Sequence, residues 1–531
     1  RYLLWNFVGR QNDIQGKYDN LDGNWISGID FVDELHLGKG TQTNLPDDAK
    51  NNKGRNVYFF LPFIIGLIGL MYHAQRDLKS FYVLLVLFLF TSIALKIFLN
   101  ERPFEPRERD YALVGSFYVF AIWVGFGVYA IYEIVTGYVK SKLAGPIVIA
   151  ACLLASPTLM ATQNWDDHDR SNKYTALAMA KNYLNSCEPN AILFTIGDND
   201  TFPLWYAQEI EGIRTDVKIV NTSLFMTDWY IDQQKNKTYE SDGLPISFKH
   251  EEYVGDKLDY VAHVPKTDAR WDIKAFIDFI KDSRSTIDLE NGQTIHFYPT
   301  NKIRIPIDKN IIIKNKVVNP KYNDSIVPFI DLEIKGRAMY KNRLMMLDVI
   351  ANNNWKRPVY FTGGSFGDDD YLWMKDYLQL DGLVYKLVPV KTKNSPESPL
   401  DMGQIDSEKM YNIINKWEWG NGERTDIYHD PETRKNSISY RTNMARLMQQ
   451  LIYEEKNQEA EKIIDLALTK MPMDYYGYYT MVEPFAGGYY SIGETEKARD
   501  LLQKLILKYQ DQLNYFTHLK SSEQNDRMIE I

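Results

Sequence analysis

The sequence predicts an α-helical transmembrane bundle, followed by a soluble α/β domain and a C-terminal helical TPR-like region. Three observations support this fold class. Residues 56–163 hold four apolar runs that are almost free of charge outside short loops. From residue 164 to about 405, short apolar runs alternate with helical patterns. Residues 406–531 carry the small residues and proline of tetratricopeptide repeats.

The apolar runs predict four transmembrane helices, at residues 57–72, 81–99, 112–138 and 145–160. A spanning helix needs about 20 apolar residues. The second and third runs meet this length, whereas the first and fourth reach it only with their polar flanks. The alternative is a buried hairpin of a soluble protein, but four such runs joined by short loops favour a membrane bundle.

The charges of the connecting loops predict the orientation, because cytoplasmic loops carry an excess of Lys and Arg. The first and third loops share one side by alternation and hold Arg76, Lys79, Lys140 and Lys142, against three arginines in the second loop. We therefore expect the first and third loops in the cytoplasm. Residues 1–55, the second loop and the C-terminal region would lie outside it.

The second loop is the most unusual stretch of the membrane part. Its arginines, Arg102, Arg107 and Arg109, alternate with four acidic residues, Glu101, Glu105, Glu108 and Asp110. Arginine forks match phosphate oxygens, so we expect the arginines to bind the phosphate of a polyprenyl-phosphate at the lipid boundary. Glu108 and Asp110 would support them. The alternative is an ion-pair network that satisfies itself and caps two helices.

A β-α-β pattern opens the soluble domain, with apolar runs at 191–196 and 216–221 on either side of a helical stretch. This order predicts a parallel sheet, and ligands bind such sheets at the carboxyl ends of the strands. Asp198, Asn199 and Asp200 follow the first strand, where they would suit a divalent cation or sugar hydroxyls. The alternative is a turn whose side chains cap the next helix.

A second polar cluster leaves the last apolar run at Asn164–Arg170. His168 could bind a metal with Asp166, Asp167 and Asp169. Such clusters are more often solvated helix ends, so we predict no metal site here.

The soluble domain is expected to span residues 164–405, with a β-rich insertion near 235–335. Short β runs are predicted at 294–298, 303–307 and 311–314. A helix at 344–351 and strands at 359–362 and 383–388 would return to the main sheet. In the tail, Ala460, Ala467 and Pro472 fit one helical repeat, and Gly493 and Ala498 fit a second.

Net charge, cysteine content and residue spacing limit the functions that the sequence supports. A net charge of -9 gives no basic surface for nucleic acid. Cys152 lies in an apolar run and Cys187 in the soluble part, so a disulfide between them is not expected. The spacing supports no Ser-His-Asp or Cys-His arrangement, and the catalytic residue stays unknown.

Several long strings resemble a bacterial membrane family known as domain of unknown function 2723. They are RYLLWNFVGRQNDIQG at the start, RERDY in the arginine loop, GDNDTFPLWY after the first strand and NNNWKRP before residue 359. That family is similar to protein O-mannosyltransferases of the membrane glycosyltransferase C superfamily.

The resemblance implies a multi-pass protein of the bacterial inner membrane with its large C-terminal region in the periplasm. It also implies the C-terminal part of a glycosyltransferase, whose partners are the lipid bilayer, a polyprenyl-phosphate sugar donor and a protein acceptor. Asn6 and Arg10, in the first string, would support the site. In that superfamily the catalytic carboxylate lies in the first external loop, so we expect it upstream of Arg1. The alternatives are a membrane-anchored scaffold and a transporter accessory.

Overall fold

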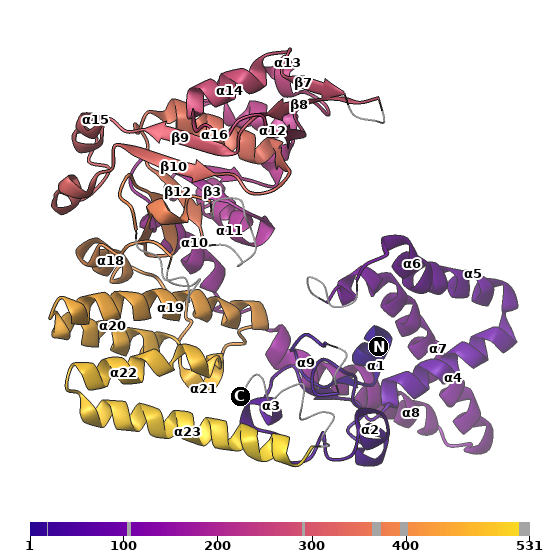
Figure 1. Cartoon of the computed structure of the whole chain (residues 1–531). Helices are drawn as coiled ribbons and strands as arrows, with labels where there is room; N and C mark the ends of the chain where they lie inside the picture. The colour runs from indigo at the N-terminus through magenta and orange to yellow at the C-terminus, as the bar shows by residue number, and fades with distance from the viewer. Residues whose placement is uncertain (18–19, 103–107, 289–291, 364–372, 393–401, 520–531) are drawn as a thin grey trace.

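The computed structural model describes residues 1–17, 20–102, 108–288, 292–363, 373–392 and 402–519 (Figure 1). The apolar helices, in indigo and violet, form one part of the molecule. The α/β region, from magenta to orange, forms the second. The yellow C-terminal helices lie next to the α/β region, and the last of them reaches the N-terminal segment near α3 (Asp47–Lys50).

The apolar segment folds into six helical pieces, α4 (Leu61–Arg76), α5 (Leu78–Leu89), α6 (Leu95–Leu99), α7 (Val114–Tyr138), α8 (Ala144–Leu153) and α9 (Leu159–His168). Turns of π-helix join α5 to α6 and α8 to α9. Among the described residues, three continuous helices are therefore long and apolar enough to cross a membrane, at Leu78–Leu99, Asp110–Tyr138 and Ala144–His168. They coincide with the second, third and fourth predicted spans and indicate a membrane protein.

The helix of the first predicted span begins and ends four residues later than the predicted run 57–72. Its apolar run begins at Val57, but α4 begins at Leu61 and has 16 residues, or about 24 Å. Val57 belongs to β2 (Asn56–Val57), which pairs with β1 (Gly9–Arg10). Phe59 and Phe60 then take φ values of 53° and 59°, which end the extended backbone and delay the helix. By length alone α4 is not a spanning helix.

Two glycines allow α4 and α7 to pack in close contact. A Cβ atom on Gly69 would lie 1.8 Å from the carbonyl oxygen of Trp123, and one on Gly127 would lie 2.0 Å from that of Ile65. The two backbones therefore touch, as they do in membrane helix pairs with small residues at the interface. This contact attaches the short helix to a long one.

The order of the helices gives the bundle two ends. The connections at Asp77 and at residues 139–143 share one end. The described part of residues 1–60, the end of α6, the helical turn at Asp110 and the chain after His168 share the other. The connections with Arg76, Lys79, Lys140 and Lys142 therefore lie at the end opposite to the soluble region.

The α/β region is built on one five-stranded sheet. Across the sheet its strands are β13 (Leu378–Asp381), β14 (Val384–Leu387), β12 (Val359–Thr362), β3 (Ile192–Thr195) and β4 (Lys218–Asn221). β12, β3 and β4 are parallel, and the last two strands in the chain are antiparallel. The predicted β-α-β unit is confirmed, with α10 (Thr175–Ser186) before it and α11 (Asp198–Glu209) inside it.

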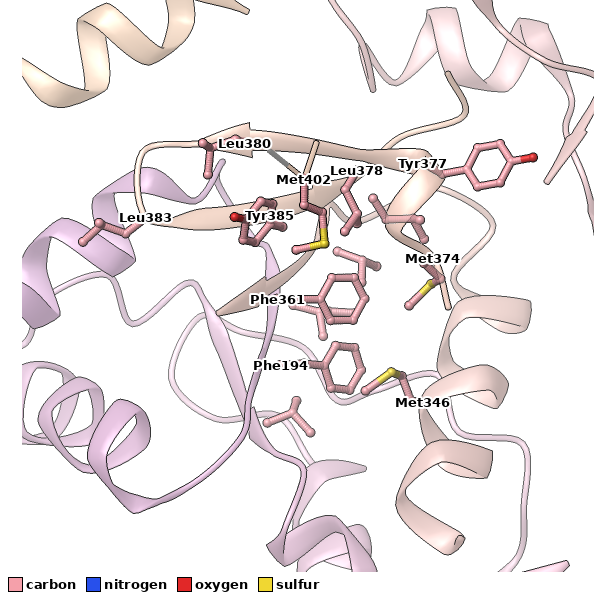
Figure 2. Packing of buried hydrophobic residues seen from close by; sticks show 14 of the residues in the cluster. Phe194, Met346, Phe361, Met374, Tyr377, Leu378, Leu380, Leu383, Tyr385 and Met402 are labelled. Carbon is pink, nitrogen blue, oxygen red and sulfur yellow. The ribbon is translucent and has the colours of Figure 1, made fainter. Parts of the chain in front are cut away.

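The core of this region lies between the sheet and α16 (Lys341–Asn353). Phe194 of β3 and Phe361 of β12 stack with ring centroids 5.6 Å apart, and Met346 of α16 packs beside them (Figure 2). Each of these side chains is at least 98% buried. Burial of one such side chain contributes about 1.5–3 kcal/mol.

The β-rich insertion forms two small sheets. One holds β10 (Phe329–Glu333), β9 (Lys302–Pro306) and β6 (Trp271–Asp272), and the other holds β11 (Ala338–Tyr340), β5 (Tyr260–His263), β8 (Thr294–Tyr298) and β7 (Thr286–Asp288). The strands predicted at 294–298 and 303–307 are confirmed. The strand predicted at 311–314 is wrong, because these residues form α15 (Lys309–Lys314). The Asp308 carboxylate caps that helix, accepting a hydrogen bond from the Asn310 backbone at 2.9 Å.

The C-terminal part is helical, as predicted. It contains α18 (Ser407–Ile414), α19 (Pro431–Tyr453), α20 (Asn457–Lys470), α21 (Met473–Tyr476), α22 (Glu483–Ser491) and α23 (Thr495–Thr517). α19 packs against α20 and α22 against α23. Ala460, Ala467 and Ala498 are buried between these helices. The assignment to tetratricopeptide repeats stays a prediction.

We predict that Gly69→Val separates α4 from α7. The added side chain meets backbone atoms, which cannot move as a side chain can, so the loss of stability should be at least about 1–3 kcal/mol. Thermal unfolding of the detergent-solubilised chain measures it. Gly125→Val on α7 is the matched control, because its Cβ meets nothing within 4 Å. Equal melting temperatures for the two variants would contradict the contact.

Candidate functional site

Polar side chains gather where the helical bundle meets the soluble region. They come from the N-terminal segment, from the residues before α4, from the last turns of α9 and from the chain before α19. We call this group the membrane-proximal junction, and it consists of Arg10, Asp13, Asn56, Asn164, Asp167 and Tyr428. β1 pairs with β2, so that Arg10 lies opposite Asn56. This pairing joins the N-terminal segment to the residues before α4.

Asp13 joins the two ends of the chain. Its side chain is 4% exposed, and its carboxylate accepts hydrogen bonds from Asn52 at 2.7 Å, from the Tyr428 hydroxyl at 2.8 Å and from Arg434 at 2.9 Å. Burial and the negative charge of Asp13 raise the pKa of Tyr428 well above its usual value. The phenol therefore stays protonated and keeps donating. Asp13 has its charge balanced by Arg434 and serves as a structural carboxylate.

Asp167 and Asn164 bring the last membrane helix into the junction. The Asn56 amide donates to Asn164 at 3.2 Å and to Asp167 at 3.4 Å, and Asn164 donates to the Tyr58 hydroxyl at 2.6 Å. Asp167 is 6% exposed, and His168 lies 2.7 Å from its carboxylate. These contacts hold the end of the helix against the N-terminal segment.

Arg10 differs from its neighbours in the junction. Its guanidinium lies over the Trp5 ring, 4.5 Å from the centroid. Its Nε atom is buried and has no hydrogen-bond partner among the residues that the structure describes. A buried donor without a partner is costly. Arg10 is therefore the junction residue best suited to bind an anion.

The arginine loop is partly engaged in ion pairs. Arg109 lies 3.6 Å from Glu101, which also accepts from Lys96 at 2.7 Å. Glu108 accepts a hydrogen bond from the Tyr2 hydroxyl and lies 3.1 Å from Arg1. The part of the loop that is described thus contains pairs of the kind that the ion-pair alternative requires.

The remaining residues predicted to bind or support the donor phosphate lie in separate parts of the structure. Arg107 lies outside the described residues, and Arg102 lies three residues after the end of α6. Asp110 begins the helical turn before α7. The Asn6 amide donates to the Tyr2 carbonyl at 2.9 Å, within α1 (Tyr2–Phe7). A contact of Asn6 with a ligand stays a prediction.

The three polar residues after β3 differ in their contacts and exposure. The Asp200 carboxylate accepts from the backbone of Ile196 at 2.8 Å and of Gly197 at 2.9 Å, and from the Thr362 hydroxyl at 2.6 Å. It therefore caps α11 and connects β3 to β12, in agreement with the capping alternative. Asp198 and Asn199 are exposed. Their binding of a cation or a sugar stays a prediction.

The described part of the chain contains no group of three His, Cys, Asp or Glu residues that could hold a metal ion. The cluster around His168 does not form one, because Asp166 and Asp169 do not join Asp167 in contacting the His168 ring.

Sequence reasoning missed most of the junction. Tyr428 and Arg434 lie more than 400 residues from Asp13, and no pattern in the sequence links them. One signal was present: the polar string Arg10-Gln-Asn-Asp13 directly follows the mostly apolar residues 2–9, next to which buried charges would need partners.

The fold and the junction define a class, a membrane protein with a large α/β region attached at one end of an apolar helical bundle. Within it, residues 176–409 match the family described as TMEM260-associated domain 2. The match covers the main sheet, the insertion and the start of α18, which is less than half of the chain. No curated protein and no solved structure gave a significant match.

We predict that Asp13→Ala releases the N-terminal segment from the C-terminal helices. The change leaves Arg434 partly buried without its counter-ion, which should cost about 3–5 kcal/mol. Tyr428→Phe removes one hydrogen bond and should cost about 1 kcal/mol. Protease sensitivity of residues 1–55 and thermal unfolding measure both effects. Asp30→Asn, at an exposed carboxylate of the same segment, is the control. Stability of Asp13→Ala equal to this control would contradict the role of Asp13.

Proposed function

We propose that this chain is the C-terminal part of a membrane glycosyltransferase, similar to protein O-mannosyltransferases, that uses a polyprenyl-phosphate-linked sugar and a protein acceptor. The match of residues 176–409 to TMEM260-associated domain 2, downstream of membrane-type helices, is the observation that carries the proposal. The resemblance of the longer strings to the domain of unknown function 2723 agrees with it.

The donor's phosphate would lie at the membrane boundary, at the end of the bundle that holds the junction. Arg102, Arg107 and Arg109 remain candidates for binding it, and the junction adds Arg10. A guanidinium can pair with two phosphate oxygens at once, which makes arginine the preferred residue for this task. The Nε atoms of Arg10 and Arg109 are both buried without a hydrogen-bond partner among the described residues, which supports both as candidates.

Transfer of the sugar to a Ser or Thr hydroxyl needs a base that takes the hydroxyl proton. Asp13 has its charge balanced by Arg434 and also accepts hydrogen bonds from Asn52 and Tyr428. Asp167 is similarly engaged by Asn56 and His168. Neither carboxylate suits the role of base, and the proposal assigns that role to none of the described residues.

A membrane-anchored scaffold is the second candidate. The ion pairs of Arg109 with Glu101 and of Arg1 with Glu108 favour it, since charges that satisfy one another need no ligand. The two candidates differ in whether the arginines at this end of the bundle affect chemistry or only stability.

We predict that Arg10→Gln in the full-length protein weakens use of the lipid-linked donor. Loss of a desolvated charge contact costs about 2–5 kcal/mol, which is at least about 30-fold in donor use. Sugar transfer from a polyprenyl-phosphate donor in membranes measures the effect, with protein level and melting temperature recorded in parallel. Arg76→Gln is the matched control, because Arg76 lies at the opposite end of the bundle. Unchanged transfer in Arg10→Gln would remove Arg10 from the donor site, and an unchanged Arg109→Gln as well would favour the scaffold.

The proposal also requires the soluble region to lie outside the cytoplasm, where the donor's sugar would be presented. We predict that a reporter active only in the cytoplasm stays silent when fused to the C-terminus. The same reporter fused after Lys142, in the connection before α8, should be active. Activity of the C-terminal fusion would reverse the topology and exclude a donor used outside the cytoplasm.

A further inference from the structure

A cavity of about 330 Å³ lies beside β4, the edge strand of the main sheet. α11 forms one wall, and α12 (Asp228–Gln234) with the following turn forms the other. Cavities from about 300 Å³ upward are the usual size of small-molecule sites. This cavity belongs to the soluble region and involves none of the junction residues.

Aromatic side chains form its walls. They are Trp205 from α11, Trp229 and Tyr230 from α12, and Tyr239 from the turn. Trp229 is 55% exposed and Tyr239 is 53% exposed. Half-exposed aromatic rings that line one cavity offer flat apolar faces to a ligand.

Amide side chains provide the polar part of the lining. Gln208 is held in place, because its amide donates to the carbonyls of Arg214 at 2.7 Å and Val217 at 2.9 Å. Gln234 is 94% buried, and its Oε1 atom has no hydrogen-bond partner among the described residues. A buried acceptor of this kind is costly unless something donates to it. Gln234 is thus the lining residue with a side-chain acceptor that no described group satisfies.

The charged groups in the lining are already engaged. Lys218 donates to the Asn236 carbonyl at 2.8 Å and to the Thr238 hydroxyl at 2.9 Å, and burial lowers the pKa of Lys218 to about 8. Glu209 accepts a hydrogen bond from the Tyr239 hydroxyl. With one acid and one base, both bonded to the protein, the cavity favours neither an anion nor a cation.

We propose that this cavity binds a neutral saccharide of one or two pyranose rings. The C–H face of a sugar ring is apolar and packs on Trp205 or Trp229, while its hydroxyls exchange hydrogen bonds with Gln234 and other amides. Each sugar hydroxyl both donates and accepts, which meets the lone acceptor of Gln234. The inference does not rest on the proposed transferase activity, since a scaffold with this cavity would bind sugars equally.

The test is a binding titration of the full chain in detergent, followed by intrinsic tryptophan fluorescence and by calorimetry. The probes are mannose, glucose, N-acetylglucosamine and a mannose disaccharide, with adenosine as an aromatic, non-saccharide competitor. We expect saturable binding of at least one sugar in the millimolar range, which is common for small, solvent-exposed sites. Adenosine should not displace it.

Two variants test the residues. Trp229→Ala and Gln234→Leu should each weaken sugar binding by at least about tenfold, or about 1.4 kcal/mol. Gln234→Leu keeps side-chain volume and removes an unpaired buried oxygen, so its melting temperature should not fall. Trp165→Ala, at a tryptophan that is 72% exposed outside the cavity, is the matched control and should bind normally.

Three results would overturn the proposal. One is the absence of saturable binding for all four sugars. Another is equal affinity in Trp229→Ala, Gln234→Leu and the wild-type chain, which would place the sugar elsewhere. The third is tight binding of adenosine alone, which would identify a site for a planar base. A failed transfer assay leaves the inference intact, because binding is measured without a lipid donor.

Discussion

The arrangement of this protein depends on one buried carboxylate. Asp13 lies in the N-terminal segment, yet its partners Tyr428 and Arg434 belong to the start of the C-terminal helices. A buried carboxylate is stable only with opposite charge and hydrogen bonds around it, so the two parts must stay in contact. Tyr515, which donates to the Thr41 carbonyl at 2.8 Å, and Lys508, which lies 3.1 Å from Asp48, extend the same contact.

Features that depend on local sequence could be predicted. The strand at Ile192–Thr195 and the helix at Lys341–Asn353 follow from short apolar runs and helical spacing. Predictions failed where a polar neighbour overrode the apolar pattern. The isoleucines at 311–313 favour a strand by type, but the cap from Asp308 begins a helix before them. The run from Val57 loses its first turn because β2 pairs with β1.

The candidate sites also differ in how far the sequence alone predicts them. The arginine loop and Asp198–Asp200 are contiguous in sequence, so their positions could be foreseen, though not that Asp200 would bond to Thr362 across 162 residues. The junction and the aromatic cavity could not be foreseen. Each is assembled from segments whose approach is decided by tertiary packing, and their side chains show no periodicity. A sequence shows which polar residues would need hydrogen-bond partners if they were buried. It seldom shows which residues supply those partners.

The separation of 415 residues between Asp13 and Tyr428 has a consequence for how the protein is made. Asp13 is synthesised before the helices of the bundle, whereas Tyr428 follows both the bundle and the α/β region. At the usual rate of about 5–20 residues per second, the carboxylate waits roughly 20–80 s for its partner. Until then the Asp13 carboxylate remains hydrated, since a charge needs a protein partner only once it is buried. The contact between the N-terminal segment and the C-terminal helices therefore forms only after the bundle and the α/β region have been made.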